Sequence, residues 1–89
     1  MLHVALFETK PGGGYYIFPG LNKQEIKLRI EEKFPNQINQ FRCVFYRTFI
    51  DDGEALSFAR RLQGEKEINL KKLIQSENPE FRDLFNLIA

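Results

Sequence analysis

The sequence predicts an α+β fold in which a small, mostly antiparallel three-stranded sheet is flanked by helices. The strongest strand signal is residues 41–50, which are rich in the aromatic and β-branched side chains that fit a pleated surface. It runs directly into residues 51–64, which carry helix capping and periodicity signals. Two shorter strand-like segments joined by glycines come earlier. The expected order is therefore β-β-α-β-α-α-α, in one domain over residues 1–89.

The composition is that of one small soluble domain. Nine Phe and three Tyr supply large buried areas for a chain of only 89 residues. Thirteen basic against twelve acidic residues give a net charge of +1, so nucleic-acid binding would need a local patch. A single Cys43 excludes an internal disulfide. Because the sequence has no secretory signal and no apolar run near the roughly 20 residues that span a bilayer, we expect a cytoplasmic protein without a membrane partner.

The N-terminal residues predict a hairpin. Leu2–Thr9 should form the first strand, and Gly14–Phe18 the second, which we expect Pro19-Gly20 to stop. Residues 10–14 include three consecutive glycines that suit a turn. A phosphate-cradling loop is the alternative, but the Lys-Ser/Thr of that motif is absent and a strand follows rather than a helix.

The next segment predicts a first helix over Lys23–Phe34. Asn22 is placed to cap it, and Pro35 should end it. Its partial apolar stripe consists of Ile26, Ile30 and Phe34, with Leu28 and Lys33 alongside.

The strand at residues 41–50 is apolar on both faces, so we expect it to be covered on both sides and to lie deep in the sheet. Asp51 and Glu54 then form a variant of the capping box, and Gly64 suits a left-handed helix stop. The apolar stripe of this helix is Ala55, Leu56, Phe58, Ala59 and Leu62.

Two further helices are expected after a polar connector at residues 65–67. The first should turn Ile68, Leu70, Leu73 and Ile74 towards the core. The second should begin at Asn78-Pro79, which has the pattern of a cap followed by proline at the first helical position. It should bury Phe81, Leu84, Phe85 and Ile88.

The C-terminal half carries four short motifs in a recognisable order. They are Glu54-Ala55, then Arg60-Arg61-Leu62-Gln63-Gly64, then Lys71-Lys72-Leu73-Ile74, and finally Asn78-Pro79-Glu80-Phe81-Arg82-Asp83-Leu84. This series resembles the small, single-domain bacterial branch of the GIY-YIG nuclease superfamily, which has similar motifs at nearly the same spacings. The resemblance implies a GIY-YIG-like fold, and the activity it implies is phosphodiester hydrolysis by a divalent-metal endonuclease.

The resemblance also implies where the catalytic groups of the family would fall. Family members use a tyrosine from each of the first two strands, an arginine on the first helix, often followed by a histidine, and a metal-binding glutamate after the third strand. These groups fall on Ala5, Tyr16, Arg29, Lys33 and Ala59, respectively. Tyr16 and Arg29 are thus the remnants of the catalytic set, and a methyl group at Ala59 cannot coordinate Mg²⁺. We therefore expect no metal site and no cofactor.

Three functions remain open. The first is a catalytically degenerate, non-enzymatic GIY-YIG-like domain that binds DNA or RNA. The second is a protein–protein interaction module with an exposed aromatic patch. The third is a nuclease with relocated ligands that uses Mg²⁺. The candidate nucleic-acid-binding residues are Tyr16, Arg29, Lys33, Arg60, Arg61, Lys71 and Lys72.

Three other residues have plain structural interpretations. We expect His3 to be a strand-end or partly buried histidine, and Cys43 to be a small core residue. Glu54 is the carboxylate nearest to Ala59, but capping is the simpler role for it.

Overall fold

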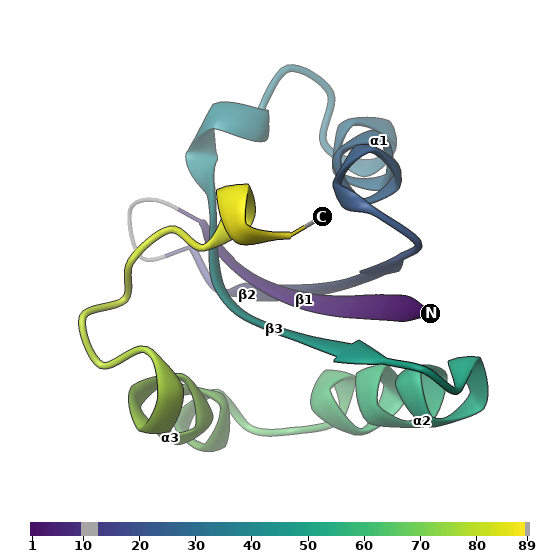
Figure 1. Cartoon of the computed structure of the whole chain (residues 1–89). Coiled ribbons are helices and arrows are strands. Elements are labelled where there is room, and N and C mark those ends of the chain that lie inside the picture. Colours follow the sequence, from purple (N-terminus) through teal and green to yellow (C-terminus); the bar gives the residue numbers. More distant parts are fainter. Residues whose placement is uncertain (10–12, 89) are drawn as a thin grey trace.

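A three-stranded antiparallel sheet forms the centre of the molecule. The computed structural model describes residues 1–9 and 13–88. β1 (Leu2–Thr9) lies between β2 (Tyr15–Gly20) and β3 (Phe41–Phe49). Helix α1 (Lys23–Lys33) covers one face of the sheet, and α2 (Asp52–Gln63) and α3 (Glu67–Glu77) cover the other (Figure 1). The predicted α+β class and the antiparallel sheet are confirmed.

The two faces of the sheet bury separate apolar clusters because successive side chains of a strand point to opposite sides. The α1 face contains Ala5, Phe7, Phe18, Phe41, Cys43, Ile26, Ile30 and Ile88. The α2 face contains Leu2, Val4, Leu6, Val44, Phe45, Ala55, Phe58, Ala59, Leu62, Leu70 and Ile74. From Val4 to Phe7 the central strand is at most 1% exposed, so β1 contributes to both clusters.

Two of the predicted helix starts, at Asn22 and Asp51, are confirmed. The Asn22 side chain accepts the backbone N–H of Glu25 at 2.9 Å and so caps α1. The Asp51 side chain accepts the N–H of Gly53 at 2.8 Å and caps α2. Both caps satisfy backbone donors that a helix leaves free in its first turn.

The second strand is longer than predicted. It continues through Pro19, which pairs with Val4, to Gly20. Since β2 is an edge strand and position 19 points away from β1, proline loses no hydrogen bond there. Of the predicted turn at residues 10–14, residues 10–12 lie outside the described part of the chain.

Some predictions for individual helix residues are wrong. Leu56 and Ile68 are 47% and 62% exposed, because each lies to the side of the stripe that faces the sheet. Gly64 ends α2 with φ −90°, in the right-handed region, and its N–H bonds to carbonyls of the last turn. A 3₁₀-like ending of this kind needs no left-handed residue.

The predicted position of β3 is also wrong. The strand is covered on both faces, as expected, but it lies at the edge of the sheet and pairs only with β1. A bulge at Val44 of β3 shifts the pairing between β1 and β3 by one residue, at the step from Leu6 to Phe7 of β1. The outer edge beside this bulge is occupied by the end of the chain.

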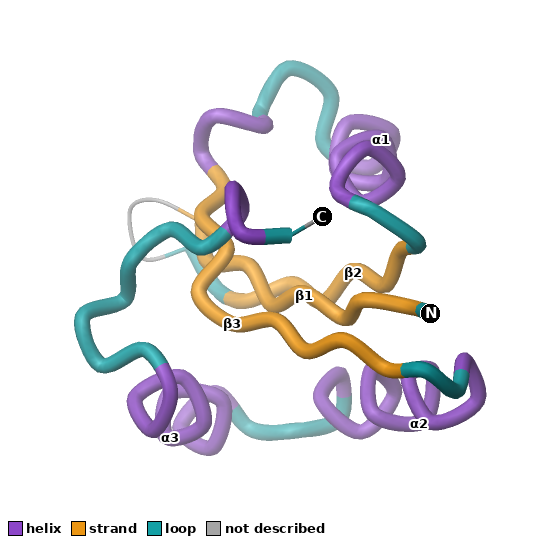
Figure 2. The backbone as a smooth tube through the Cα atoms, in the orientation of Figure 1, coloured by secondary structure: helices purple, strands orange, loops and turns teal. Residues whose placement is uncertain are grey.

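We call residues 78–88 the C-terminal strap. The predicted fourth helix is absent from it; α3 ends at Glu77, and within the strap only Phe85–Leu87 forms a 3₁₀ turn. Figure 2 shows the strap leaving α3, rounding the β3 edge and ending on the α1 face. The N–H of Leu84 donates to the carbonyl of Cys43 at 2.7 Å, and the Asp83 carboxylate accepts the N–H of Cys43 at 3.2 Å.

Asn78 does not begin a helix because its side chain is used elsewhere. Its amide donates to the carbonyls of Val44 and Arg82, each at 2.9 Å, and its oxygen accepts the N–H of Arg82 at 3.1 Å. The side chain is thereby buried between β3 and the strap, and the chain reverses at Phe81 with a positive φ of 52°.

Within residues 1–9 and 13–88, no helix has the length and apolar character needed to cross a membrane.

Candidate nucleic-acid interface

The outer edge of β2 carries unpaired backbone groups. The N–H of Thr9 donates to the carbonyl of Gly14, so odd-numbered residues of β1 direct their backbone groups towards β2. Tyr15 and Ile17 pair with the even-numbered Glu8 and Leu6. Since hydrogen-bonded and non-hydrogen-bonded pairs alternate in an antiparallel ladder, the N–H and C=O groups of Tyr15 and Ile17 point away from the sheet.

A pocket of about 320 Å³ lies across this edge. Helix α1 contributes Lys33 from one face of the sheet, and α2 contributes Gln63 from the other. The remaining lining residues are Tyr15, Tyr16, Ile17 and Phe18. The structure therefore brings together two of the predicted residues, Tyr16 and Lys33, beside backbone N–H donors.

The Tyr16 ring is held in place by two other aromatic rings. It packs edge-on against Phe34 with centroids 4.9 Å apart, and it is tilted against Phe41 at 5.8 Å. The Lys33 ammonium lies 6.0 Å from the centroid of the same Phe34 ring. Phe34 therefore lies next to both the Tyr16 ring and the Lys33 ammonium, and the phenol and the ammonium can each donate to an anion.

Tyr15 points to the other face and is committed to an internal contact. Its hydroxyl donates to the Glu8 carboxylate at 3.4 Å, and the same carboxylate pairs with Arg42. Burial, and then the Glu8 charge, raise the pKa of Tyr15. Because the Tyr15 hydroxyl is bonded to Glu8, Tyr16 is the tyrosine whose hydroxyl is available to a ligand.

Arg29 lies one helical turn before Lys33 on α1. Its guanidinium is half exposed and pairs with Glu25 of the preceding turn at 3.1 Å. This i, i+4 pair reduces the positive charge that Arg29 presents to a ligand. Arg29 extends the basic side of the pocket but does not line it.

The two alanines that the sequence resemblance assigns to catalytic positions are buried. Ala5 is fully buried on the α1 face, and Ala59 is 4% exposed on the α2 face. Ala59 lies one turn before Gln63 on α2, which packs against β2. Positions 29 and 59 thus lie on opposite faces of the sheet, each one turn from a residue that lines the pocket.

The other four candidate residues lie on the α2 face. Arg61 stacks over Phe58 with its guanidinium carbon 5.3 Å from the ring centroid, and Lys71 approaches Glu67 at 3.9 Å. Arg60 and Lys72 are exposed on α2 and α3. The seven predicted residues therefore divide between two surfaces and do not form one continuous site.

The described residues include no group of three or more His, Cys, Asp or Glu side chains placed to hold a metal ion. His3 is 7% exposed, and its Nδ1 lies 2.7 Å from the hydroxyl of Thr48 on β3. Glu54 is exposed on the first turn of α2. The pocket at the β2 edge brings Tyr16 and Lys33 together, and none of the residues that line it carries a carboxylate.

Cys43 is a core residue, as predicted, and burial raises the pKa of its thiol to about 12. At pH 8 almost no thiolate is therefore present in the folded protein. We expect iodoacetamide to leave Cys43 unmodified in native buffer and to alkylate it fully in urea, as measured by mass spectrometry. Rapid labelling of the native protein would show that the strap opens readily over this part of β3.

Gln63 was not predicted as a site residue. It lies in the sequence Leu62-Gln63-Gly64, which by itself indicates only the end of a helix. Its role depends on α2 and α1 flanking the same strand, which no local pattern reveals. The sequence did place Gln63 four residues after Ala59, and this spacing puts the two residues on the same face of a helix.

Comparison of the chain with protein-family models, with curated proteins and with solved structures found no match.

Proposed function

We propose that this protein is a GIY-YIG-like domain that binds the phosphate backbone of a nucleic acid without cleaving it. The observation that supports this proposal is the pocket at the β2 edge, where Tyr16 and Lys33 lie beside outward-facing N–H groups. Hydroxyl, ammonium, amide and backbone N–H groups are the donors that proteins use to contact phosphate oxygens.

The same pocket argues against hydrolysis. Its lining offers donors and no carboxylate, and the family's metal-binding position carries the buried methyl group of Ala59. A divalent cation in a phosphodiesterase needs oxygen ligands to hold it against the scissile phosphate. The proposed ligand contact is therefore electrostatic and hydrogen-bonded, with no bond broken.

We expect Lys33→Ala to weaken binding of a fluorescently labelled DNA about fivefold at low salt, which corresponds to loss of one charge-assisted contact of about 1 kcal/mol. The slope of log affinity against log salt should fall by about 1, because one fewer counterion is released. Fluorescence anisotropy with duplex, branched and single-stranded probes measures both quantities.

Lys27→Ala is the matched control, because Lys27 is exposed on the same helix and does not line the pocket. It removes the same charge and should change the affinity much less. Equal losses in the two variants would indicate nonspecific attraction, and undetectable binding of the unaltered protein at low salt would refute the proposal.

The aromatic version of the protein-interaction hypothesis is not supported. The large apolar side chains that the described residues expose are all aliphatic or methionine: Met1, Leu21, Leu28, Ile50, Leu56, Ile68 and Leu87. A contact between proteins would therefore combine partly exposed aromatic rings with other groups.

A further inference from the structure

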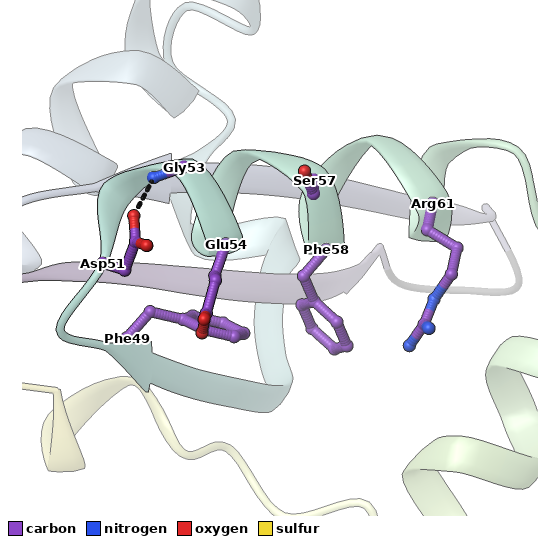
Figure 3. A pocket seen from close by; sticks show the side chains of 7 residues that line it. All are labelled: Phe49, Asp51, Gly53, Glu54, Ser57, Phe58 and Arg61. Atoms are coloured by element: carbon purple, nitrogen blue, oxygen red, sulfur yellow. Dashed lines mark hydrogen bonds between the residues drawn. The ribbon is translucent and has the colours of Figure 1, made fainter.

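A second open groove lies on the α2 face beside β3, away from the β2 edge. It has a volume of about 620 Å³. Figure 3 shows Glu54, Phe58 and Arg61 descending from one side of α2, with Phe49 at the Glu54 end of this row. The other lining residues are Asp51, Gly53 and Ser57.

The floor of the groove is aromatic and carries positive charge at one end. The rings of Phe49 and Phe58 are tilted against each other with centroids 5.3 Å apart. The guanidinium carbons of Arg47 and Arg61 lie 5.0 and 5.3 Å from the centroid of Phe58. A partner side chain placed here would meet an apolar surface, the Arg61 cation and Arg47, whose guanidinium is also paired with Glu77 at 2.9 Å.

The edge of β3 beside this groove is open. Tyr46 and Thr48 pair with the odd-numbered Ala5 and His3, whose backbone groups point towards β2. The N–H and C=O groups of Tyr46 and Thr48 therefore point outwards. The hydrogen bonds of Cys43 agree with this alternation. Cys43 also pairs with an odd-numbered residue, Phe7, so its backbone groups should point outwards, and the strap forms hydrogen bonds with them.

The strap limits how far another chain can pair along this edge. It already occupies the edge at Cys43 and Val44, next to the bulge. A partner strand can therefore extend along β3 only from Tyr46 to the end of the strand. The available stretch is short, so side chains must supply much of the specificity.

Charges along the groove define the kind of partner that fits. The turn between β3 and α2 is tight, so Glu54 lies at the Phe49 end of the groove, and Arg61 is seven residues, or about 10 Å, further along α2. A complementary antiparallel strand would present a basic residue near Glu54, an aromatic or aliphatic residue over the rings, and an acidic residue near Arg61.

This chain contains such a segment where β3 leads into α2. Arg47 and Phe49 of β3 and Asp51, the N-cap of α2, alternate in the order basic, aromatic, acidic. Because the segment has the pattern that its own groove requires, two copies related by a two-fold axis can each fill the other's groove.

We propose that two copies of this protein dimerise by antiparallel pairing of their β3 edges about Thr48, forming a continuous six-stranded sheet. In this register Phe49 of one copy lies opposite Arg47 of the other, and Ile50, the first residue after β3, lies near Tyr46 of the other copy. Ile50 is 88% exposed, the highest value among the exposed large apolar residues, and pairing would cover it. The interface is separate from the pocket at the β2 edge, so the dimer does not depend on nucleic-acid binding.

The test is sedimentation equilibrium over a range of protein concentrations. The unaltered protein should show a monomer–dimer equilibrium with a dissociation constant below about 1 mM. Ile50→Lys should weaken dimerisation at least about tenfold, since it places a charge in the paired edge. Ile68→Lys is the control, because Ile68 is equally apolar and 62% exposed but lies on α3, and this variant should dimerise normally.

A second variant acts on the backbone. Thr48→Pro removes an outward N–H that β1 does not use, so it should abolish the dimer. Circular dichroism of the same sample establishes whether the variant is folded, and the Ile50→Lys result stands independently if it is not. A chain that remains monomeric at about 1 mM, or equal dimerisation of Ile50→Lys and Ile68→Lys, would overturn the proposal.

Discussion

Replacing Phe7 with alanine is expected to lower the free energy of unfolding by about 3–5 kcal/mol, the usual cost of removing a buried phenyl ring. Phe7 is 1% exposed on the central strand and packs edge-on against Phe18, Phe41 and Phe85 at centroid distances of 5.9, 6.3 and 5.7 Å. These rings come from β2, β3 and the strap, so the lost contacts join three segments of the chain. Urea denaturation followed by circular dichroism measures the change.

The expected loss is a large part of the total, because domains of this size are stable by roughly 5–10 kcal/mol. Phe7→Leu should cost less than Phe7→Ala because it leaves a smaller cavity. Leu28→Ala removes an apolar side chain that is 58% exposed on α1, and it should change the stability by less than about 0.5 kcal/mol. Similar midpoints for Phe7→Ala and Leu28→Ala would contradict this account of the core.

The second large effect is expected for Asn78→Ala, which should cost about 3 kcal/mol. The substitution removes three hydrogen bonds and leaves the Val44 and Arg82 carbonyls and the Arg82 N–H without their partner. Buried groups that lose a partner cost about 1–3 kcal/mol each, and water entering beside the strap offsets part of that sum. Chemical denaturation measures the stability, and hydrogen exchange at the Leu84 N–H reports whether the strap has loosened.

Asn69→Ala is the matched control for Asn78→Ala. Asn69 is exposed on α3 and donates a single hydrogen bond to Glu65 at 2.9 Å, so its loss should be nearly neutral. Asn78→Asp keeps the acceptor for the Arg82 N–H but removes both donated bonds, so its stability should also fall. An Asn78→Ala protein as stable as Asn69→Ala would show that the strap is held mainly by its apolar contacts.

The parts of the fold that follow from local chemistry were predictable. Asn22 and Asp51 signal helix starts because their short acceptor side chains reach backbone donors two or three residues away. The strand at residues 41–49 was recognisable from its aromatic and β-branched content. These signals need no knowledge of distant residues.

The errors arise where a distant segment takes over a local role. β3 was predicted to lie inside the sheet because both its faces are apolar, but the strap covers part of its outer edge instead of a fourth strand. Asn78-Pro79 has the pattern of a helix start, yet the Asn78 side chain bonds to Val44, 34 residues earlier. A contact over such a sequence distance leaves no periodic trace in the chain.

The candidate site was predictable only in part. The resemblance assigned Tyr16 and Lys33 to one functional group of residues, and the structure places both in one pocket. It also assigned Arg29, whose guanidinium is paired with Glu25. Neither Gln63 nor the outward backbone groups of β2 could be predicted, because both depend on which strand lies at the edge.

Pro19 and the strap together have a consequence for solubility. Twelve of the 89 residues are aromatic, and such residues favour amyloid-type stacking of strands. Stacking of this kind would require a long sheet edge with unpaired backbone groups. Pro19 breaks the row of donors on β2, and the strap blocks the first part of β3. Each border of the sheet therefore offers only a short stretch for pairing, and concentrated solutions of the folded protein should remain clear and free of fibrils.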